Sequence, residues 1–441
     1  QAGLLDARID YNLDGVLTED ETRRAAYYRM FCKGAEWGAE YNHRECVNQD
    51  LLNITMLYHF RNAAALLGEA PYTEEYIFER LYAGLGITKH TYQLSDGTQF
   101  AHGGWQFSSK SALALETFGN AAGGYCGNYG MNCASILYDF AYLTKDEKII
   151  GQALKSVESN TYFFDLVTGS DGVAVLRKEE VINTRNTYMP GRIAFTPGGQ
   201  NFLTVALGSE AGKRMLELYL QSGFWKMELA APSLIGADTF RHLADLVTVE
   251  GLKECLQATV LEKDENGISY HYDLGTDYVL PTEEGFGDYV WTDEMARCVV
   301  VRNGDEFFRA VLNWRIEYNG KRLYENASVN NVLRVHGQNT NEVYTATVNM
   351  KSPFGFGGVY TARYGDYTII MNSSEEHSYD ITLAGSGKDC TVDLVSGQKV
   401  SFGEAVTMQP LTTMVLYTNQ EGKRVVQPPS AIVNQEQEEE T

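Results

Sequence analysis

The sequence lacks any apolar run that could span a membrane, and it has no cluster of lysine and arginine residues. A spanning helix needs roughly 18 or more apolar residues in succession, so membrane insertion is not expected. Nucleic-acid binding needs a basic face, whereas 36 basic residues against 58 acidic ones leave this chain with a formal charge of −22. The sequence therefore predicts neither a nucleic-acid partner nor a membrane-inserted segment, and it predicts no protein partner.

Several chemistry-bearing patterns are also missing. The seven cysteines are scattered, odd in number and without a CxxC pair, which argues against a zinc site and a disulfide framework. No HxxxH or HExxH pair, glycine-rich phosphate loop or nucleophile elbow occurs, so zinc, nucleotide and esterase chemistry rank low. Gln1 does not begin a charged and then apolar leader, so we expect a secreted, extracellular or periplasmic chain whose export signal has been removed.

The first informative pattern is the stretch 10–21, which matches the twelve-residue loop of an EF-hand. Gly15 stands at position 6, where the loop needs a positive φ, and Glu21 at position 12 can supply two oxygens. The expected ligands of a calcium cofactor are Asp10, Asn12, Asp14, Val16 (through its carbonyl), Thr18 and Glu21. Because only one such loop is present, we expect a structural clip and no sensor pair. The alternative is a plain acidic turn with a helix N-cap.

Hydrophobic periodicity predicts an α+β multidomain protein. Its expected parts are an EF-hand-like calcium-binding segment (1–30), an (α/α) toroid-like helical domain (31–261), an antiparallel β-sandwich domain (262–418) and a disordered acidic tail (419–441).

Apolar residues three and four apart predict the helices of the middle part. The expected helices are 50–67, 131–143, 147–157 opened by a capping box from Thr144 to Glu147, 209–222 and 249–261. In the first of these, the expected apolar face consists of Leu52, Met56, Phe60, Ala63 and Leu67. Repeated helix pairs over more than 200 residues suggest a toroid, and no fixed period supports a regular solenoid.

Short alternating runs separated by turn residues predict the strands of the sandwich. The expected strands are 297–302, 307–318, 342–350, 358–372, 379–384, 390–395 and 405–417. Asn-Gly at 303/304 and 319/320 indicates tight hairpin turns between the early strands.

Three motifs in this order resemble polysaccharide lyases that join an (α/α) toroid to a β-sandwich. Asn42-His43-Arg44-Glu45 before a long helix is similar to the Asn-His helix of heparinase II/III-type and chondroitin/hyaluronate-type lyases. The stretch 96–105, with Asp96-Gly97-Thr98 and His102, resembles the element that those families carry on the next toroid loops. The run 364–372 resembles the sandwich ends of many carbohydrate-active enzymes.

The resemblance implies β-elimination on a uronic-acid-containing glycan. Such a reaction needs neutralisation of the sugar carboxylate and a base near the sugar face. The resemblance implies that Asn42 neutralises the carboxylate, with His43 beside it in the same catalytic motif. It also implies that His102 acts as a base or binds the carboxylate. The family's catalytic tyrosine has Tyr125 and Tyr129 as its nearest candidates.

A polysaccharide or oligosaccharide is thus the expected substrate, and arginine, aromatic and amide side chains are the expected binding groups. The candidates are Trp105, Arg185, Asn186, Tyr188, Arg192, Arg315, Arg334 and His336.

Two alternatives stay open at this point. A glycoside hydrolase on the same scaffold needs two carboxylates flanking the bond, for which Asp293 and Glu294 are the most suggestive pair. A calcium- and glycan-binding protein without catalysis would use the aromatic side chains to stack on sugar rings.

Overall fold

The computed structural model describes most of the chain, with gaps. The described residues are 2–40, 47–90, 104–116, 124–125, 127–168, 174–178, 202–222, 249, 252, 259–264, 267–304, 306–318, 321–333, 340–345, 347–351, 358–382, 390–401, 403 and 405–419. The chain divides into two compact units, Gln1–Gln106 and Phe107–Thr441. The predicted acidic tail beyond residue 419 lies outside the described residues.

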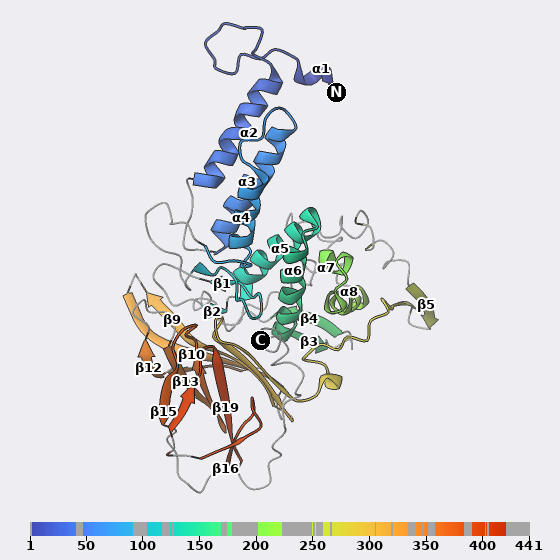
Figure 1. Ribbon diagram of the computed structural model, residues 1–441. Helices are drawn as coiled ribbons and strands as arrows, with labels where there is room; N and C mark the ends of the chain where they lie inside the picture. Colours follow the sequence, from blue (N-terminus) through green and yellow to red (C-terminus); the bar gives the residue numbers. More distant parts are fainter. Residues whose placement is uncertain are drawn as a thin grey trace. The chain divides into compact units, whose positions relative to one another are not determined.

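The first unit consists of helices (Figure 1). They are α1 (Ala2–Leu5), α2 (Arg23–Glu40), α3 (Val47–Ala65) and α4 (Glu74–Gly84). Helices α2 and α3 form an antiparallel pair in close contact. A Cβ on Gly38 would lie 2.6 Å from the backbone oxygen of Asn53, and one on Gly34 would lie 2.5 Å from the ring of Phe60. Glycine at these two places therefore allows the helices to approach each other.

The predicted apolar face of α3 is wrong. Leu52, placed on that face by the sequence, is 53% exposed. The buried residues of the helix are Val47, Asp50, Leu51, Asn53, Ile54, Leu57 and Ala64. The buried face thus contains two polar residues, Asp50 and Asn53. Because apolar periodicity counts only apolar residues, it did not predict this face.

Four helices of the second unit come before its large sheets. They are α5 (Gly127–Thr144), α6 (Glu147–Asn160), α7 (Phe202–Ala206) and α8 (Glu210–Ser222). The helices predicted at 131–143, 147–157 and 209–222 are therefore present. The predicted capping box is wrong, because Asp146 caps α6 by accepting from the backbone N–H groups of Lys148 and Ile149, both at 3.0 Å.

Small two-stranded sheets interrupt this helical part. Each is an antiparallel pair: β1 (Leu115–Glu116) with β2 (Gly124–Tyr125), β3 (Phe164–Thr168) with β4 (Ala174–Lys178), and β5 (Thr259–Asp264) with β6 (Gly267–Tyr272). The helix predicted for 249–261 is wrong over its last turn, since Thr259 pairs with Tyr272 in a strand. The 3₁₀-helices η2 (Thr161–Phe163) and η5 (Glu284–Phe286) complete the description of this part.

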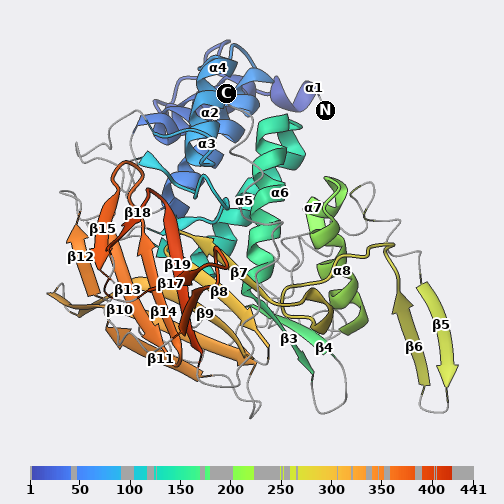
Figure 2. The same cartoon turned by 60° about the horizontal axis from the view of Figure 1, so that its bottom comes forward.

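Two antiparallel sheets dominate the C-terminal part (Figure 2). The five-stranded sheet has the order β11 (Thr340–Thr345), β10 (Lys321–Leu333), β9 (Glu306–Tyr318), β8 (Cys298–Asn303) and β7 (Tyr289–Asp293). The six-stranded sheet has the order β12 (Thr347–Lys351), β13 (Gly358–Tyr364), β14 (Tyr367–Asn372), β19 (Thr412–Asn419), β16 (Cys390–Asp393) and β17 (Lys399–Val400). A separate pair joins β15 (Tyr379–Thr382) to β18 (Ala405–Met408).

The two sheets share one apolar core. Its buried members include Val299, Val301 and Phe308 from the first sheet and Ile369 and Val415 from the second. These residues alternate along their strands, as expected for sheets that each turn one face inward. The prediction of a mixed helical and antiparallel-sheet protein, with its sheets in the C-terminal part, is confirmed.

A buried ion pair joins the helical part of the second unit to the first sheet. Arg309 on β9 is fully buried, and its Nη1 lies 2.7 Å from Oδ1 of Asp165 on β3. Its Nη2 also donates to the backbone oxygen of Phe164 at 3.0 Å. A guanidinium group without water needs such partners, so this arginine fixes β3 against the sheet.

We expect Asp165→Asn to lower the free energy of unfolding by about 3–5 kcal/mol, because it leaves a buried guanidinium without its counter-ion. Urea unfolding measures the change. A matched control is Lys213→Gln, which breaks the partly exposed Lys213 and Glu210 pair at 2.6 Å and should cost less than about 1 kcal/mol. Equal effects of the two variants would contradict a special role for the buried pair.

Candidate metal-binding loop

The two ends of the loop 10–21 are fastened to each other by backbone hydrogen bonds. Arg8 and Thr22 form an isolated antiparallel bridge. The N–H of Ile9 donates to the carbonyl of Glu21 at 2.9 Å, and the N–H of Arg23 donates to the carbonyl of Ala7 at 2.9 Å. The chain therefore enters and leaves the loop at one closed neck, which we call the bridge at 7–9 and 21–23.

Inside the loop, side-chain oxygens accept bonds from nearby backbone N–H groups. Asp10 Oδ2 accepts from Gly15 at 2.9 Å, and Asp14 Oδ1 accepts from Val16 at 2.8 Å. Gly15 has φ +79°, the conformation that the sequence predicts for position 6. Asn12 Oδ1 accepts from the N–H of Asp14 at 3.1 Å. These contacts wind the chain around its own backbone N–H groups.

Glu21 closes the loop and is only 3% exposed. Its Oε2 accepts from the N–H and the hydroxyl of Thr18, at 2.8 and 3.0 Å. Its Oε1 is buried and accepts no hydrogen bond, and the same is true of Asp10 Oδ1. Burying a carboxylate oxygen without a donor or a cation costs free energy of folding, so a positive partner at these two atoms would be stabilising.

Buried carboxylates elsewhere in the described part of the chain lie next to a cation or a donor. Asp165 faces Arg309, and Asp50 Oδ2 lies 3.3 Å from Nε2 of His90. Glu294 lies 2.9 Å from Nζ of Lys110. The loop 10–21 differs from these places because the protein supplies no cation to its two buried oxygens.

The donor set of the loop fits a hard cation that prefers oxygen ligands. It combines carboxylates with the Asn12 amide, the Val16 carbonyl and the Thr18 hydroxyl. Among the described residues, no three His, Cys, Asp or Glu side chains converge closely enough to hold a metal ion by themselves. The carboxylates of Asp10 and Asp14 are instead engaged by the loop's own N–H groups.

Most of the residues predicted for lyase chemistry lie outside the described residues. These are Asn42, His43, His102, Arg185, Asn186, Tyr188, Arg192, Arg334 and His336. Tyr129 lies on α5 and Arg315 on β9, but their side chains are not among those described. The arrangement of these residues as one lyase site therefore stays a prediction.

Two of the predicted residues can be placed. Tyr125 on β2 is 3% exposed, and its ring stacks on Phe163 with centroids 4.0 Å apart. This position is that of a packing residue. Trp105 is half-buried, and Nζ of Lys89 lies 5.5 Å from the centre of its ring.

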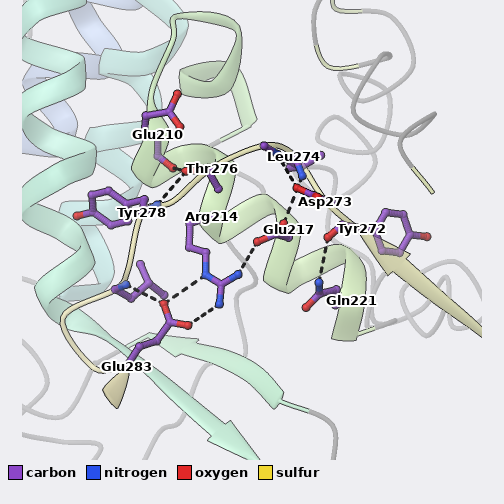
Figure 3. Close-up of polar contacts among 12 residues, drawn as sticks. Glu210, Arg214, Glu217, Gln221, Tyr272, Asp273, Leu274, Thr276, Tyr278 and Glu283 are labelled. Atoms are coloured by element: carbon purple, nitrogen blue, oxygen red, sulfur yellow. Dashed lines mark hydrogen bonds and ion pairs between the residues drawn. The ribbon is translucent and has the colours of Figure 1, made fainter. Parts of the chain in front are cut away.

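A dense polar network occurs where α8 meets the segment 272–283, which leads to the first sheet (Figure 3). Arg214 binds both oxygens of Glu283, through Nη2 at 2.5 Å and Nε at 3.3 Å, and also contacts Glu217. These carboxylates, Glu283 first, raise the pKa of the Arg214 guanidinium. Glu217 and Glu283 in turn accept from the N–H groups of Leu274 and Leu280.

Two further hydrogen bonds hold the segment 272–283, one from β8 and one from α8. Arg302 on β8 donates through Nη1 to the carbonyl of Pro281 at 2.9 Å. Gln221 at the end of α8 donates to the carbonyl of Tyr272 at 3.0 Å. Each charge in this network has a protein partner, so we interpret it as the anchor of a connecting segment and not as a binding site.

Asp293 and Glu294, the carboxylates suggested for a hydrolase, are 0% and 1% exposed. Asp293 accepts from the N–H of Ala296 at 2.8 Å and from the hydroxyl of Ser111. Glu294 Oε1 accepts from the hydroxyl of Thr413 at 2.6 Å. These contacts tie the turn near Ser111 and strand β19 to β7, which is a structural role.

Compared with protein-family models, curated proteins and solved structures, the chain matches none of them. No helix among the described residues is long and apolar enough to cross a membrane.

Sequence reasoning missed the bridge at 7–9 and 21–23 and the contact between Thr18 and Glu21. The second had a signal, because Thr18-Glu-Asp-Glu21 fits the capping-box pattern, in which Glu reaches back to the first N–H. The bridge had no signal in the sequence, since its bonds join backbone groups and a single residue pair leaves no alternating pattern.

The buried position of Asp293 predicts a pH effect. Burial raises the pKa of this carboxyl above its ordinary value. The stability that it contributes is therefore complete below the unfolded pKa and is lost as the pH rises through the folded pKa. Asp293→Asn keeps the shape of the neutral carboxyl, so we expect the variant to gain stability relative to the wild type between pH 4 and pH 7, by urea unfolding. A constant difference across this range would contradict a raised pKa.

Proposed function

We propose that the loop 10–21 binds one calcium ion. The observation that carries the proposal is the pair of buried carboxylate oxygens, Glu21 Oε1 and Asp10 Oδ1, which accept no hydrogen bond. A capping role alone explains only Oε2 of Glu21, which Thr18 occupies. A divalent cation would compensate both remaining oxygens, and the spacing of the oxygen ligands is that of an EF-hand loop.

In this proposal the ion would be held by Asp10, Asn12, Asp14, the carbonyl of Val16, Thr18 and Glu21. Calcium supplies positive charge and takes six to eight oxygen ligands, whereas magnesium demands a stricter octahedral set. The role is structural. Both the segment before the loop and the loop itself contact α2, since Arg24 Nε lies 3.7 Å from Asp6 Oδ1 and Cζ of Arg29 lies 4.9 Å from the ring centre of Tyr11. Calcium would complete this attachment.

We expect calcium to raise the melting temperature of the wild-type chain, because an ion that binds only the folded state stabilises it by about 2.7 kcal/mol at 100 times its dissociation constant. Glu21→Gln should remove most of this shift, since it takes one charge from the closing ligand. Differential scanning calorimetry with calcium and with a chelator measures both effects.

The matched control is Glu19→Gln, which removes an equal charge from the same loop at a position that supplies no ligand. Glu19 is 95% exposed, and its carboxylate lies 3.8 Å from Nη2 of Arg8. We expect this variant to keep the calcium shift. Wild-type melting that is the same with calcium and with chelator would contradict the structural clip.

For the whole chain we propose a secreted carbohydrate-active enzyme, a polysaccharide lyase that cleaves a uronic-acid-containing glycan by β-elimination. The support is the order of its parts: helices first, then large antiparallel sheets, as in the (α/α) toroid and β-sandwich lyases that its motifs resemble. A toroid arrangement of the helices belongs to this proposal. An extracellular setting suits it, since loops of this kind in extracellular modules bind calcium at roughly 10⁻⁴ to 10⁻³ M.

One observation ranks a hydrolase lower. The carboxylates that the sequence suggested for it, Asp293 and Glu294, are buried and bound to protein groups, so neither can flank a glycosidic bond. A glycan-binding protein without catalysis differs from the lyase only in giving no product.

We expect the wild type to raise the ultraviolet absorbance of a uronic-acid polysaccharide, because β-elimination leaves a conjugated double bond. His102→Ala and Asn42→Ala should abolish that signal without changing the melting temperature, since each removes a group expected to react with or neutralise the substrate. A near-normal rate in either variant would remove that residue from the site. New reducing ends without absorbance would point to a hydrolase, and glycan binding without either signal to a binding protein.

A further inference from the structure

The bridge at 7–9 and 21–23 lies directly against the two acidic residues that the calcium proposal depends on most. Ile9 precedes Asp10, and its N–H bonds the backbone of Glu21 itself. The first and last ligand positions are therefore brought together by backbone bonds that involve no ligand oxygen. Opening this neck would separate Asp10 from Glu21 and release the loop between them.

Resting on the proposed function, we propose that the bridge at 7–9 and 21–23 is the positioning element of the calcium site, and that it makes one loop sufficient for binding within a single chain. A closed neck removes much of the chain entropy that a free twelve-residue loop would lose on binding. It also fixes the backbone of Glu21, whose Oε1 is buried.

A second copy of the loop is the competing way to order the site. Leu13, Val16 and Leu17 are 86%, 59% and 49% exposed, and such side chains could pack against another chain. The bridge makes that contact unnecessary, because both ends of the loop are already held by Ala7 and Arg23. We therefore infer one calcium ion per chain, with an affinity that does not depend on protein concentration.

A substitution at Arg23 can remove one hydrogen bond of the bridge, the one from its N–H to the carbonyl of Ala7, without disturbing the rest of the structure. It is the first residue of α2, and its side chain is exposed. Thr22 caps the helix by accepting from the N–H of Ala25 at 3.2 Å through Oγ1. Proline is well tolerated at the first position of a helix, and it prefers an extended residue before it, such as the bridged Thr22. Arg23→Pro should thus delete the N–H that bonds Ala7 and leave α2 intact.

The test is calorimetric titration of calcium into the full chain after chelator treatment, for wild type, Arg23→Pro and the matched control Arg23→Ala. We expect one ion per chain in the wild type and the alanine variant, and an affinity lower by about three- to tenfold in the proline variant, the usual weight of one backbone hydrogen bond. Trypsin cleavage after Arg8 in calcium should also be faster in the proline variant than in the alanine variant.

The outcomes separate the two proposals. If the wild type binds no calcium, the proposed function fails. If the wild type binds calcium and both Arg23 variants bind it equally well, the bridge is not the positioning element. An affinity that rises with protein concentration, or half an ion per chain, would show that a second copy orders the site. Should Arg23→Pro lose helical circular dichroism, the pair Ile9→Pro and Ile9→Ala tests the other bond, with the same outcomes.

Discussion

A carboxylate oxygen taken out of water must be given a donor or a cation, and this constraint organises both units of the chain. In the loop 10–21 the protein provides neither a donor nor a cation to two such oxygens, because Glu21 Oε1 and Asp10 Oδ1 accept no hydrogen bond. The loop is also closed at its neck and wound by its own N–H groups. A folded loop with unmet negative charge is what a cation site requires, and from this we infer calcium.

The second unit meets the same constraint with its own side chains. Arg309 compensates Asp165 between β3 and the first sheet, and Lys110 compensates Glu294. Arg214 holds Glu217 and Glu283 where α8 meets the segment before β7. Three of these pairs join segments that are distant in sequence, whereas Arg214 and Glu217 lie on the same helix. The charges of all four pairs are satisfied, so the pairs do not suggest a ligand.

The sequence predicted elements whose pattern is local and missed what depends on tertiary contacts. The strand 307–318 was predictable because polar and apolar residues alternate from Asn313 to Tyr318 and an Asn-Gly turn stands on each side of it. The buried face of α3 was not, because Asp50 and Asn53 lie on it and Asp50 meets His90 from another part of the chain. The cap of α6 shifted from Thr144 to Asp146, since two candidate caps stand close together and Thr144 bonds the carbonyl of Phe140 instead. The calcium ligands could be named in advance because their spacing is fixed by one loop, whereas the bridge beside them left no pattern.

We infer that the loop 10–21 holds one calcium ion. Its most direct measurement is the metal content of the purified full chain after equilibrium dialysis against calcium in the presence of excess magnesium. We expect one calcium ion per chain, without magnesium in its place. A chain that retains no calcium at millimolar concentration, or that retains magnesium equally well, would contradict it.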